Sequence, residues 1–278
     1  MTRLVSTRAG IGRMLDEDTV ELLDVPFPDL GAALAGGCTV AELTAAAATA
    51  TRPVQEAELL APIPRPSKIW AVGFGYAAHR AEVGNTDQPT EPMVFLKAPS
   101  SVTATGQPIR FPRVAPRQVD YEGELGVVVG ARLTDVDPAV ARMAIAGYTV
   151  CNDVSARDVQ KGRIPGRLPD VSTAKSFDTF TPMGPALVTL DELPDPDDLR
   201  LQTWVDEELR QDARTRDLVT PVPEIVSYLS QQTTLEPGDV VLTGTPAGVG
   251  HKRGIFLRSG QTVRIVIEGV GELVNTCA

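Results

Sequence analysis

Short apolar runs, separated by turns that contain glycine or proline, dominate the hydrophobic pattern of this chain. Residues 125–129 are apolar and mostly β-branched apart from Gly126, which is typical of a strand. Similar runs recur at residues 68–73, 92–97, 146–153, 199–205, 209–211, 240–242, 262–268 and 273–276. Helical patterns are fewer and occur at residues 40–50, 76–83, 134–144 and 220–232. Many short strands and few helices predict a β-dominated α+β fold.

Residues 1–60 have the pattern of a small separate unit at the start of the chain. Two apolar runs, residues 4–5 and 19–23, predict strands, and the alanine-rich residues 40–50 predict a helix. Residues 51–66 then contain four prolines, which favour an extended connector. We therefore predict a small amino-terminal α/β domain over residues 1–60 and a larger domain over residues 61–278.

Composition narrows the classes of protein that this chain resembles. A formal net charge of −10 over 278 residues argues against a general nucleic-acid surface, and the three scattered cysteines predict reduced thiols. Residues 1–8 lack the apolar region of a signal peptide, and no apolar run is long enough to span a membrane. We expect a cytoplasmic protein without a nucleic-acid or membrane partner. Only His79 and His251 are available for histidine chemistry.

Two glutamates at the start of the strand at residues 125–129 are the main candidates for chemistry. Glu122 and Glu124 are two residues apart, so in a strand they share a face, roughly 6.5–7 Å apart along the chain. They form either an exposed acidic strand start or a site for a hard divalent cation, which prefers carboxylate oxygens. Asp153 lies at or just beyond the end of another predicted strand, where functional side chains often gather.

Further charged residues have both a structural and a functional interpretation. His79 and Glu82 share a helix face, either as a solvated pair or as an imidazole tuned for general-base work. Lys97 ends a predicted strand, whereas Lys175 lies in a segment apolar enough to be partly buried. Residues 161–170 form a basic, glycine- and proline-rich loop, which is either plain surface or an entrance that attracts anions. Glycines at positions 73, 75 and 84 would permit a mobile lid around the predicted helix at 76–83.

Four segments in this order resemble the fumarylacetoacetate hydrolase family, in its bacterial form with a small amino-terminal domain. The resemblance covers roughly residues 68–276, and the segments are residues 120–124, 147–158, 175–180 and 242–250. It implies a mixed β-sandwich roll, usually assembled as a homodimer. It also implies an Mg²⁺ or Mn²⁺ ion held by three carboxylates, which carry over onto Glu122, Glu124 and Asp153. Three such oxygens leave about three octahedral positions for water and a chelating substrate.

The resemblance also assigns roles around the metal. It implies a His79–Glu82 lid pair and active-site lysines at Lys97 and Lys175. The residues expected to contact the substrate are Tyr76, Arg157, Gln160 and Thr245. The chain departs from the family at two places, where Gly75 replaces a frequent asparagine and where the basic residues 161–170 replace a frequently aromatic segment. Both departures lie where substrate specificity would be set.

Three functional hypotheses follow for a small anionic oxo-acid ligand. The first is metal-dependent hydrolysis of a C–C bond in a 2-oxo or 1,3-dicarbonyl acid of the acylpyruvate or fumarylpyruvate type, with His79 activating water. The second keeps the same residues but needs only enolate stabilisation, as in decarboxylation of an oxaloacetate-like acid, 2-hydroxydienoate isomerisation or keto–enol isomerisation. The third is a non-catalytic oxo-acid-binding protein. The same residues would serve all three functions.

Overall fold

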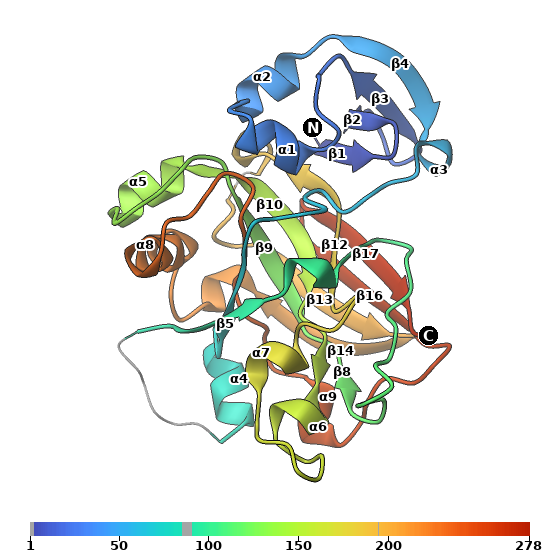
Figure 1. Ribbon diagram of the computed structural model, residues 1–278, viewed down its shortest axis with the longest axis vertical. Coiled ribbons are helices and arrows are strands. Elements are labelled where there is room, and N and C mark those ends of the chain that lie inside the picture. Colours follow the sequence, from blue (N-terminus) through green and yellow to red (C-terminus); the bar gives the residue numbers. More distant parts are fainter. Residues whose placement is uncertain (1–2, 85–90, 194) are drawn as a thin grey trace.

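The computed structural model describes residues 3–84, 91–193 and 195–278, and it is dominated by strands. Eleven of the described strands form one mixed sheet in the order β4-β3-β2-β1-β12-β10-β9-β15-β5-β6, with β7 beside β12. A second sheet has the order β14-β13-β16-β17, and β8 pairs with β11. The main sheet is open, with β4 and β6 at its ends. The predicted β-dominated α+β fold is confirmed (Figure 1).

The elements are short, as the pattern of apolar runs predicts. The strands are β1 (Arg3–Thr7), β2 (Gly10–Met14), β3 (Thr19–Leu23), β4 (Ala48–Pro53), β5 (Ile69–Gly73), β6 (Met93–Lys97), β7 (Val102–Ala104), β8 (Val119–Asp120), β9 (Gly123–Val129), β10 (Ile145–Asn152), β11 (Ser155–Ala156), β12 (Thr181–Val188), β13 (Arg200–Val205), β14 (Glu208–Arg214), β15 (Val240–Leu242), β16 (Thr262–Ile267) and β17 (Gly271–Thr276). The helices are α1 (Leu30–Ala35), α2 (Val40–Ala45), α3 (Val54–Ala57), α4 (Ala77–Glu82), α5 (Pro138–Met143), α6 (Arg157–Gln160), α7 (Val171–Ala174), α8 (Val222–Gln232) and α9 (Gly250–Arg253), with 3₁₀ turns η1 (Pro99–Ser101), η2 (Leu190–Glu192) and η3 (Thr215–Asp217). None of the described helices combines the length and the apolar character that a membrane span requires.

The antiparallel pair β9–β10 forms the centre of the molecule. Every residue of both strands is buried, which explains why their sequences are nearly continuous apolar runs. The two strands approach closely at Gly126, where a Cβ atom would lie 2.5 Å from Sγ of Cys151. The register pairs Glu124 with Cys151, so a carboxylate stands inside the core. Such a group requires partners of its own.

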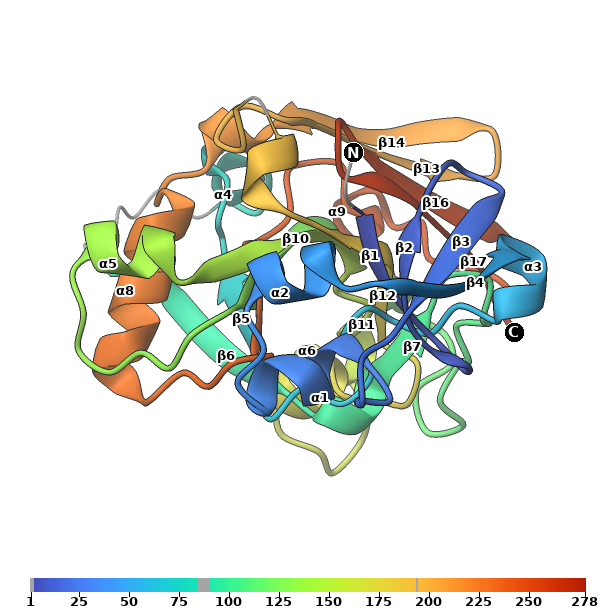
Figure 2. The ribbon, with the colours of Figure 1, turned by 90° about the horizontal axis from the view of Figure 1, so that it is seen from above.

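Residues 1–60 share both a sheet and a core with the rest of the chain. Strand β1 pairs with β12, with Leu4 opposite Leu187. One buried cluster contains Leu30 and Leu34 from this unit together with Val240 from the central sheet. Figure 2, seen from the end of the molecule that carries these elements, shows them lying over the central strands. The domain boundary at residue 60 stays a prediction.

The structure differs from the predicted elements at a few positions. The predicted helix at residues 40–50 is wrong in its second half, because α2 ends at Ala45 and β4 follows. Residues 48–53 pair with β3, and this sheet pairing outweighs the helix propensity of alanine. The predicted connector at 51–66 likewise begins with the end of β4 and with α3. The hairpin β13–β14 is confirmed, with Val205 opposite Glu208.

Candidate active site

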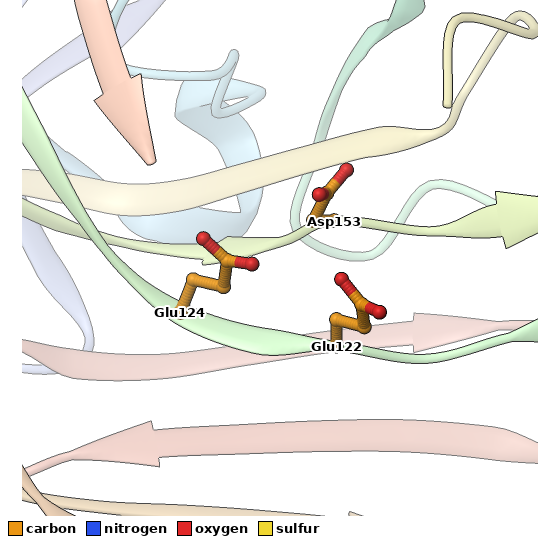
Figure 3. A group of neighbouring side chains, drawn as sticks. All are labelled: Glu122, Glu124 and Asp153. Atoms are coloured by element: carbon orange, nitrogen blue, oxygen red, sulfur yellow. The ribbon is translucent and has the colours of Figure 1, made fainter. Parts of the chain in front are cut away.

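Three carboxylates meet at the ends of the central strands. Glu122 immediately precedes β9, Glu124 is its second residue, and Asp153 follows the last residue of β10. One oxygen from each carboxylate lies within 4.8 Å of the others, and Figure 3 shows the three side chains grouped together. The backbone fixes this arrangement, because the Asp153 N–H donates to the Glu122 carbonyl over 2.8 Å. Glu122 and Glu124 therefore share a face, as predicted.

Two buried lysines form ion pairs with two of these carboxylates, Glu122 and Asp153. Lys175 Nζ donates to Glu122 Oε2 over 2.6 Å and to Asp153 Oδ2 over 2.5 Å. Lys97 Nζ donates to the second oxygen of Asp153 and to the Phe180 carbonyl. Lys175 is the residue directly after the short helix α7, and Lys97 is the last residue of the edge strand β6. Both predicted lysines thus lie beside the carboxylates, and they replace lost hydration with direct ion pairs.

The third carboxylate is electrostatically different from the other two. Burial, followed by the charges of Asp153 and Glu122, raises the pKa of Glu124 well above its usual range. Its described hydrogen-bond donor is the Gly244 N–H at 2.7 Å. Burial also raises the pKa of Glu122, but Lys175 and then Arg157 outweigh it and hold that pKa below its usual range. A cation would relieve the excess negative charge around Glu124.

The donor set fits a hard divalent metal ion. Three buried carboxylates without sulfur or imidazole donors are the ligands that Mg²⁺ and Mn²⁺ prefer. Glu122, Glu124 and Asp153 would hold the ion, as the sequence predicts. The chemistry of the donors leaves the choice between the two metals open.

His79 and Glu82, the predicted general base and the carboxylate that orients it, both lie on α4. His79 Nδ1 is 3.3 Å from Glu82 Oε2, and Glu82 Oε1 accepts a hydrogen bond from the Gly248 N–H over 3.1 Å. Burial lowers the pKa of His79, and the opposing charges of Glu122 and Glu82 do not overcome it. The imidazole is therefore neutral at neutral pH, which is the form that accepts a proton.

Arg157 is held at the first position of α6 by a carboxylate that the sequence analysis did not assign. Asp120 Oδ2 accepts from Arg157 Nε over 2.9 Å, and Arg157 Nη2 reaches Glu122 Oε1 over 2.5 Å. Arg157 Nη1 donates to Gln160 Oε1 over 3.0 Å, so the two predicted substrate contacts lie together. Asp120 also accepts from the backbone N–H of Gly250 and of His251, which ties α9 to the site.

These residues surround a cavity of about 530 Å³. Six of the predicted site residues line it, namely His79, Glu122, Arg157, Gln160, Lys175 and Thr245. The predicted residues Glu82, Lys97, Glu124 and Asp153 lie outside this lining. Glu82 contacts it through His79, and Asp153 contacts it through Lys175. Tyr76 is fully buried, lies outside the lining, and its hydroxyl has no hydrogen-bond partner among the described residues. Its predicted substrate contact stays a prediction.

Two supporting residues carried little signal in the sequence. Gln211 of β14 accepts from the Gly123 N–H over 3.0 Å and donates to Thr245 Oγ1 over 2.7 Å, so it joins β9 to the glycine-rich loop. Nothing in a polar residue of a hairpin strand indicates such a role. His251 lines the cavity, and its only sequence signal was that it is one of two histidines.

The two departures from the family pattern have structural counterparts. Gly75 packs against the glycine-rich loop, where a Cβ atom would lie 2.3 Å from the Thr243 carbonyl oxygen. Of the basic loop at 161–170, Lys161 lines the cavity. Among the glycines expected to permit a lid, Gly75 is thus closely packed, whereas Gly84 has open space around its Cβ position.

Comparison with known proteins decides the family. The model of the fumarylacetoacetate (FAA) hydrolase C-terminal family matches residues 68–278. The chain belongs to this family. Oxaloacetate tautomerase YisK from Bacillus subtilis is 42% identical over 228 residues, which cover 80% of this chain and 73% of that protein. The mitochondrial oxaloacetate tautomerase FAHD2B from Bos taurus is 41% identical over 225 residues, covering 80% of this chain and 70% of that protein.

Solved structures of the FAA hydrolase family have the same fold over the whole chain. The fumarylacetoacetate hydrolase of Exiguobacterium antarcticum superposes with a TM-score of 0.84 at 33% identity, covering 100% of this chain and 99% of that one. The 2-hydroxyhepta-2,4-diene-1,7-dioate isomerase of Mycobacterium marinum gives a TM-score of 0.80 at 35% identity, covering 100% and 98%. These likenesses confirm the predicted family fold. They place this chain among tautomerases, isomerases and hydrolases that share one architecture, and so in a family of enzymes.

Proposed function

We propose that this protein is a divalent-metal-dependent tautomerase that interconverts the keto and enol forms of an oxaloacetate-type 2-oxo acid. One observation carries the proposal: Glu122 of the carboxylate triad, the buried Lys175 and the neutral imidazole of His79 line one cavity. Tautomerisation requires these parts and no attacking water. Two relatives that are 41% and 42% identical carry the name oxaloacetate tautomerase, which supports the same choice.

The chain's own residues provide binding, charge stabilisation and proton transfer. Arg157 and Gln160 bind the carboxylate next to the oxo group. Lys175 faces the negative charge that develops on the C2 oxygen when the C3–H bond breaks and its electron pair forms the C2–C3 double bond. His79, oriented by Glu82, takes the C3 proton, and the C2 oxygen then gains a proton to give the enol. A bound Mg²⁺ or Mn²⁺ ion supplies a Lewis acid that further lowers the cost of the enolate.

The test follows the enol form of oxaloacetate directly. The purified protein is mixed with freshly dissolved enol-oxaloacetate in the presence of Mg²⁺, Mn²⁺ or a chelator, and the decay of enol absorbance is compared with the uncatalysed rate. We expect metal-dependent acceleration and no loss of carbon, which NMR verifies. Release of pyruvate and CO₂ would identify a decarboxylase instead. Tight binding without any turnover would identify an oxo-acid-binding protein.

A second candidate is hydrolysis of an acylpyruvate, and the size of the cavity favours it. A volume of about 530 Å³ is within the range of sites for drug-sized ligands, so a chain longer than oxaloacetate has room. In this reaction His79 would deprotonate a water that attacks the distal carbonyl. Metal-dependent appearance of pyruvate and a second carboxylic acid from acetylpyruvate, without acceleration of enol decay, would select the hydrolase over the tautomerase.

A further inference from the structure

A cluster of basic side chains contributes to the wall of the cavity. Arg157, Lys161 and His251 belong to its lining. Lys161 is one helical turn beyond Arg157, and its N–H donates to the Arg157 carbonyl over 3.0 Å. Arg163 and Lys252 add further positive charge around the imidazole of His251. Figure 1 shows that both α6 and α9 lie at the end of the molecule remote from β1–β4.

The positive charge of this cluster is not compensated locally. Arg157 is paired with Asp120 and Glu122, but none of Lys161, Arg163 and Lys252 forms an ion pair with another described residue. Partial burial, followed by the charges of Arg157 and Arg163, lowers the pKa of Lys161. A concentration of unpaired cations in a chain of net charge −10 creates a local field that attracts anions.

His251 contributes a ring nitrogen without a hydrogen-bond partner among the described residues. Its backbone is fixed, because its N–H donates to Asp120 Oδ2 over 2.9 Å. Its Nδ1 atom is buried and has no hydrogen-bond partner among the described residues. Burial, followed by the charges of Lys161 and Arg157, lowers the pKa of the imidazole to about 4. A buried, unpaired ring nitrogen is costly, and a ligand that pairs with it removes this cost.

We propose that Lys161 and His251 form a subsite for a second carboxylate of the substrate, so that the protein selects dicarboxylates over monocarboxylates. This inference rests on the proposed function, because it assumes that the oxo-acid end of the substrate lies at the carboxylate triad. Arg157 contacts Glu122 of the triad, and it lines the same cavity as Lys161 and His251. A short oxo acid bound at the triad would therefore direct its far end toward Lys161 and His251.

Binding of two matched ligands tests the subsite without requiring catalysis. Calorimetry compares 2-oxoglutarate with 2-oxopentanoate, which has the same carbon chain but lacks the second carboxylate, on the Mn²⁺-loaded protein. We expect the wild type to bind 2-oxoglutarate at least about tenfold more tightly, as one charge-assisted hydrogen bond allows. Lys161→Met should reduce this preference several-fold and Lys161→Met/His251→Leu should abolish it. Affinity for 2-oxopentanoate should stay unchanged in both variants.

Arg253→Met is the matched control. Arg253 lies on the same short helix as His251, pairs with Glu208 and is outside the cavity lining, so its loss should leave the preference intact. Equal binding of both ligands by the wild type, no binding of 2-oxoglutarate, or an unchanged preference in the variants would overturn the subsite. The tautomerase activity is measured separately. A protein that fails to accelerate enol decay but loses its dicarboxylate preference in these variants would keep the subsite and refute the proposed reaction.

Discussion

Glu124 differs from its two neighbours in having no cationic partner of its own. Glu122 and Asp153 each form ion pairs, whereas Glu124 forms none with another described residue and accepts only from the Gly244 N–H. Its raised pKa reflects burial and then the like charges beside it. In the metal-free protein this residue is therefore a source of instability, and in the metal-bound protein it should be a ligand.

Substitution of Glu124 should separate these two roles. We expect Glu124→Gln to weaken Mn²⁺ binding by at least about 100-fold, comparable to or greater than the loss of a supporting residue around a metal. A group whose folded pKa is raised binds protons more strongly when folded, so stability falls as pH rises above the ordinary glutamate value. The metal-free Glu124→Gln variant should therefore be more stable than the metal-free wild type at pH 7. Thermal melts with and without Mn²⁺ measure both effects.

The same thermal melts can contradict this prediction. If metal-free Glu124→Gln melts below the metal-free wild type across pH 5–8, the carboxylate stabilises the fold and the electrostatic account of the triad is incorrect.

His79 should determine the acid side of the pH profile. We expect His79→Asn to lower kcat about 10²–10⁴-fold with little change in KM, as loss of a general base does. Because burial lowers the pKa of His79, the wild-type rate should decline only below the ordinary value of 6.5. Enol decay measured between pH 5 and 8 checks this. A decline centred above pH 7 would exclude His79 as the base.

The sequence predicted the site better at the residues that carry charge than at the residues that position them. Spacing placed Glu122 and Glu124 on one face of a strand, and the family resemblance assigned both of them, together with Asp153, to a metal site. Asp120 and Gln211 act through hydrogen bonds to backbone groups that are distant in the chain, such as Gly250 and Gly123. No local spacing contains that information, because only the folded chain brings those groups together.

At the scale of elements, the glycine-rich loop at residues 243–250 links the His79–Glu82 pair to the central strands. The Gly248 N–H donates to Glu82, and its carbonyl accepts from the hydroxyl of Tyr121 over 2.9 Å. Gly248 has φ +108°, and a Cβ atom there would lie 2.0 Å from the Arg210 carbonyl oxygen. The loop thus requires glycine at this position both for its conformation and for its contact with β14.

Gly248→Ala should therefore reduce both stability and activity. We expect a loss of about 1–3 kcal/mol in the free energy of unfolding from the forced shift of packed groups. We also expect a fall in kcat, because Glu82 no longer orients His79. Gly260→Ala is the matched control, since Gly260 has φ +87° with open space around it and costs only about 1–2 kcal/mol of backbone strain. Equal kinetics for the two variants would show that the loop does not position the base.

The short helix α7 orients Lys175 and depends on one cap. Asp170 Oδ1 accepts from the Thr173 N–H over 2.9 Å, and Lys175 follows the helix directly. We expect Asp170→Ala to cost about 1 kcal/mol of stability and to lower kcat through a misplaced Lys175. Asp29→Ala removes the equivalent cap of α1 over 2.8 Å in the amino-terminal unit, so it should cost similar stability and leave kcat unchanged. Denaturant unfolding and steady-state kinetics on both variants test this.

The same cap predicts a pH dependence. Hydrogen bonds from the side chain and then the N–H of Thr173 lower the pKa of Asp170 below 3.8. A carboxylate whose folded pKa is depressed contributes its full stabilisation above the unfolded value and loses it as pH falls through the folded value. The stability difference between wild type and Asp170→Ala should therefore be constant above about pH 5 and shrink below about pH 4. A difference that grows at low pH would contradict this assignment.

Element type was predictable where the pattern was regular, and not where tertiary pairing decided it. The runs that became β9 and β10 were recognisable because strands buried on both faces are almost purely apolar. Residues 48–50 include two alanines, whose propensity favours a helix continuing from α2, yet these residues form β4 because they pair with β3. The sequence alone does not show which strand of the sheet has an edge free to pair with these residues.

At the scale of the whole molecule, residues 1–60 and the main sheet form one continuous structure. Strands β1–β4 extend the central sheet from β12, and the buried cluster with Leu30 and Val240 spans both parts. We expect a single cooperative unfolding transition when circular dichroism and tryptophan fluorescence are followed together. A chain shortened to residues 61–278 should aggregate, because it exposes the apolar surface beneath α1. Two separate transitions would show that the predicted domains unfold independently.

The homodimer also belongs to this scale and stays a prediction. Light scattering on the purified protein tests it, and the expected mass is twice the chain mass of 29.6 kDa.

Lys175, which bridges Glu122 and Asp153, has a consequence for how the protein responds to its surroundings. Because Lys175 already neutralises part of the negative charge of these carboxylates, we expect the chain to fold without a bound metal ion. Newly made chains would accumulate intact during a shortage of magnesium or manganese, as a silent reserve. When the ions return, the reserve would become active within the time that an ion takes to diffuse and bind, with no new synthesis.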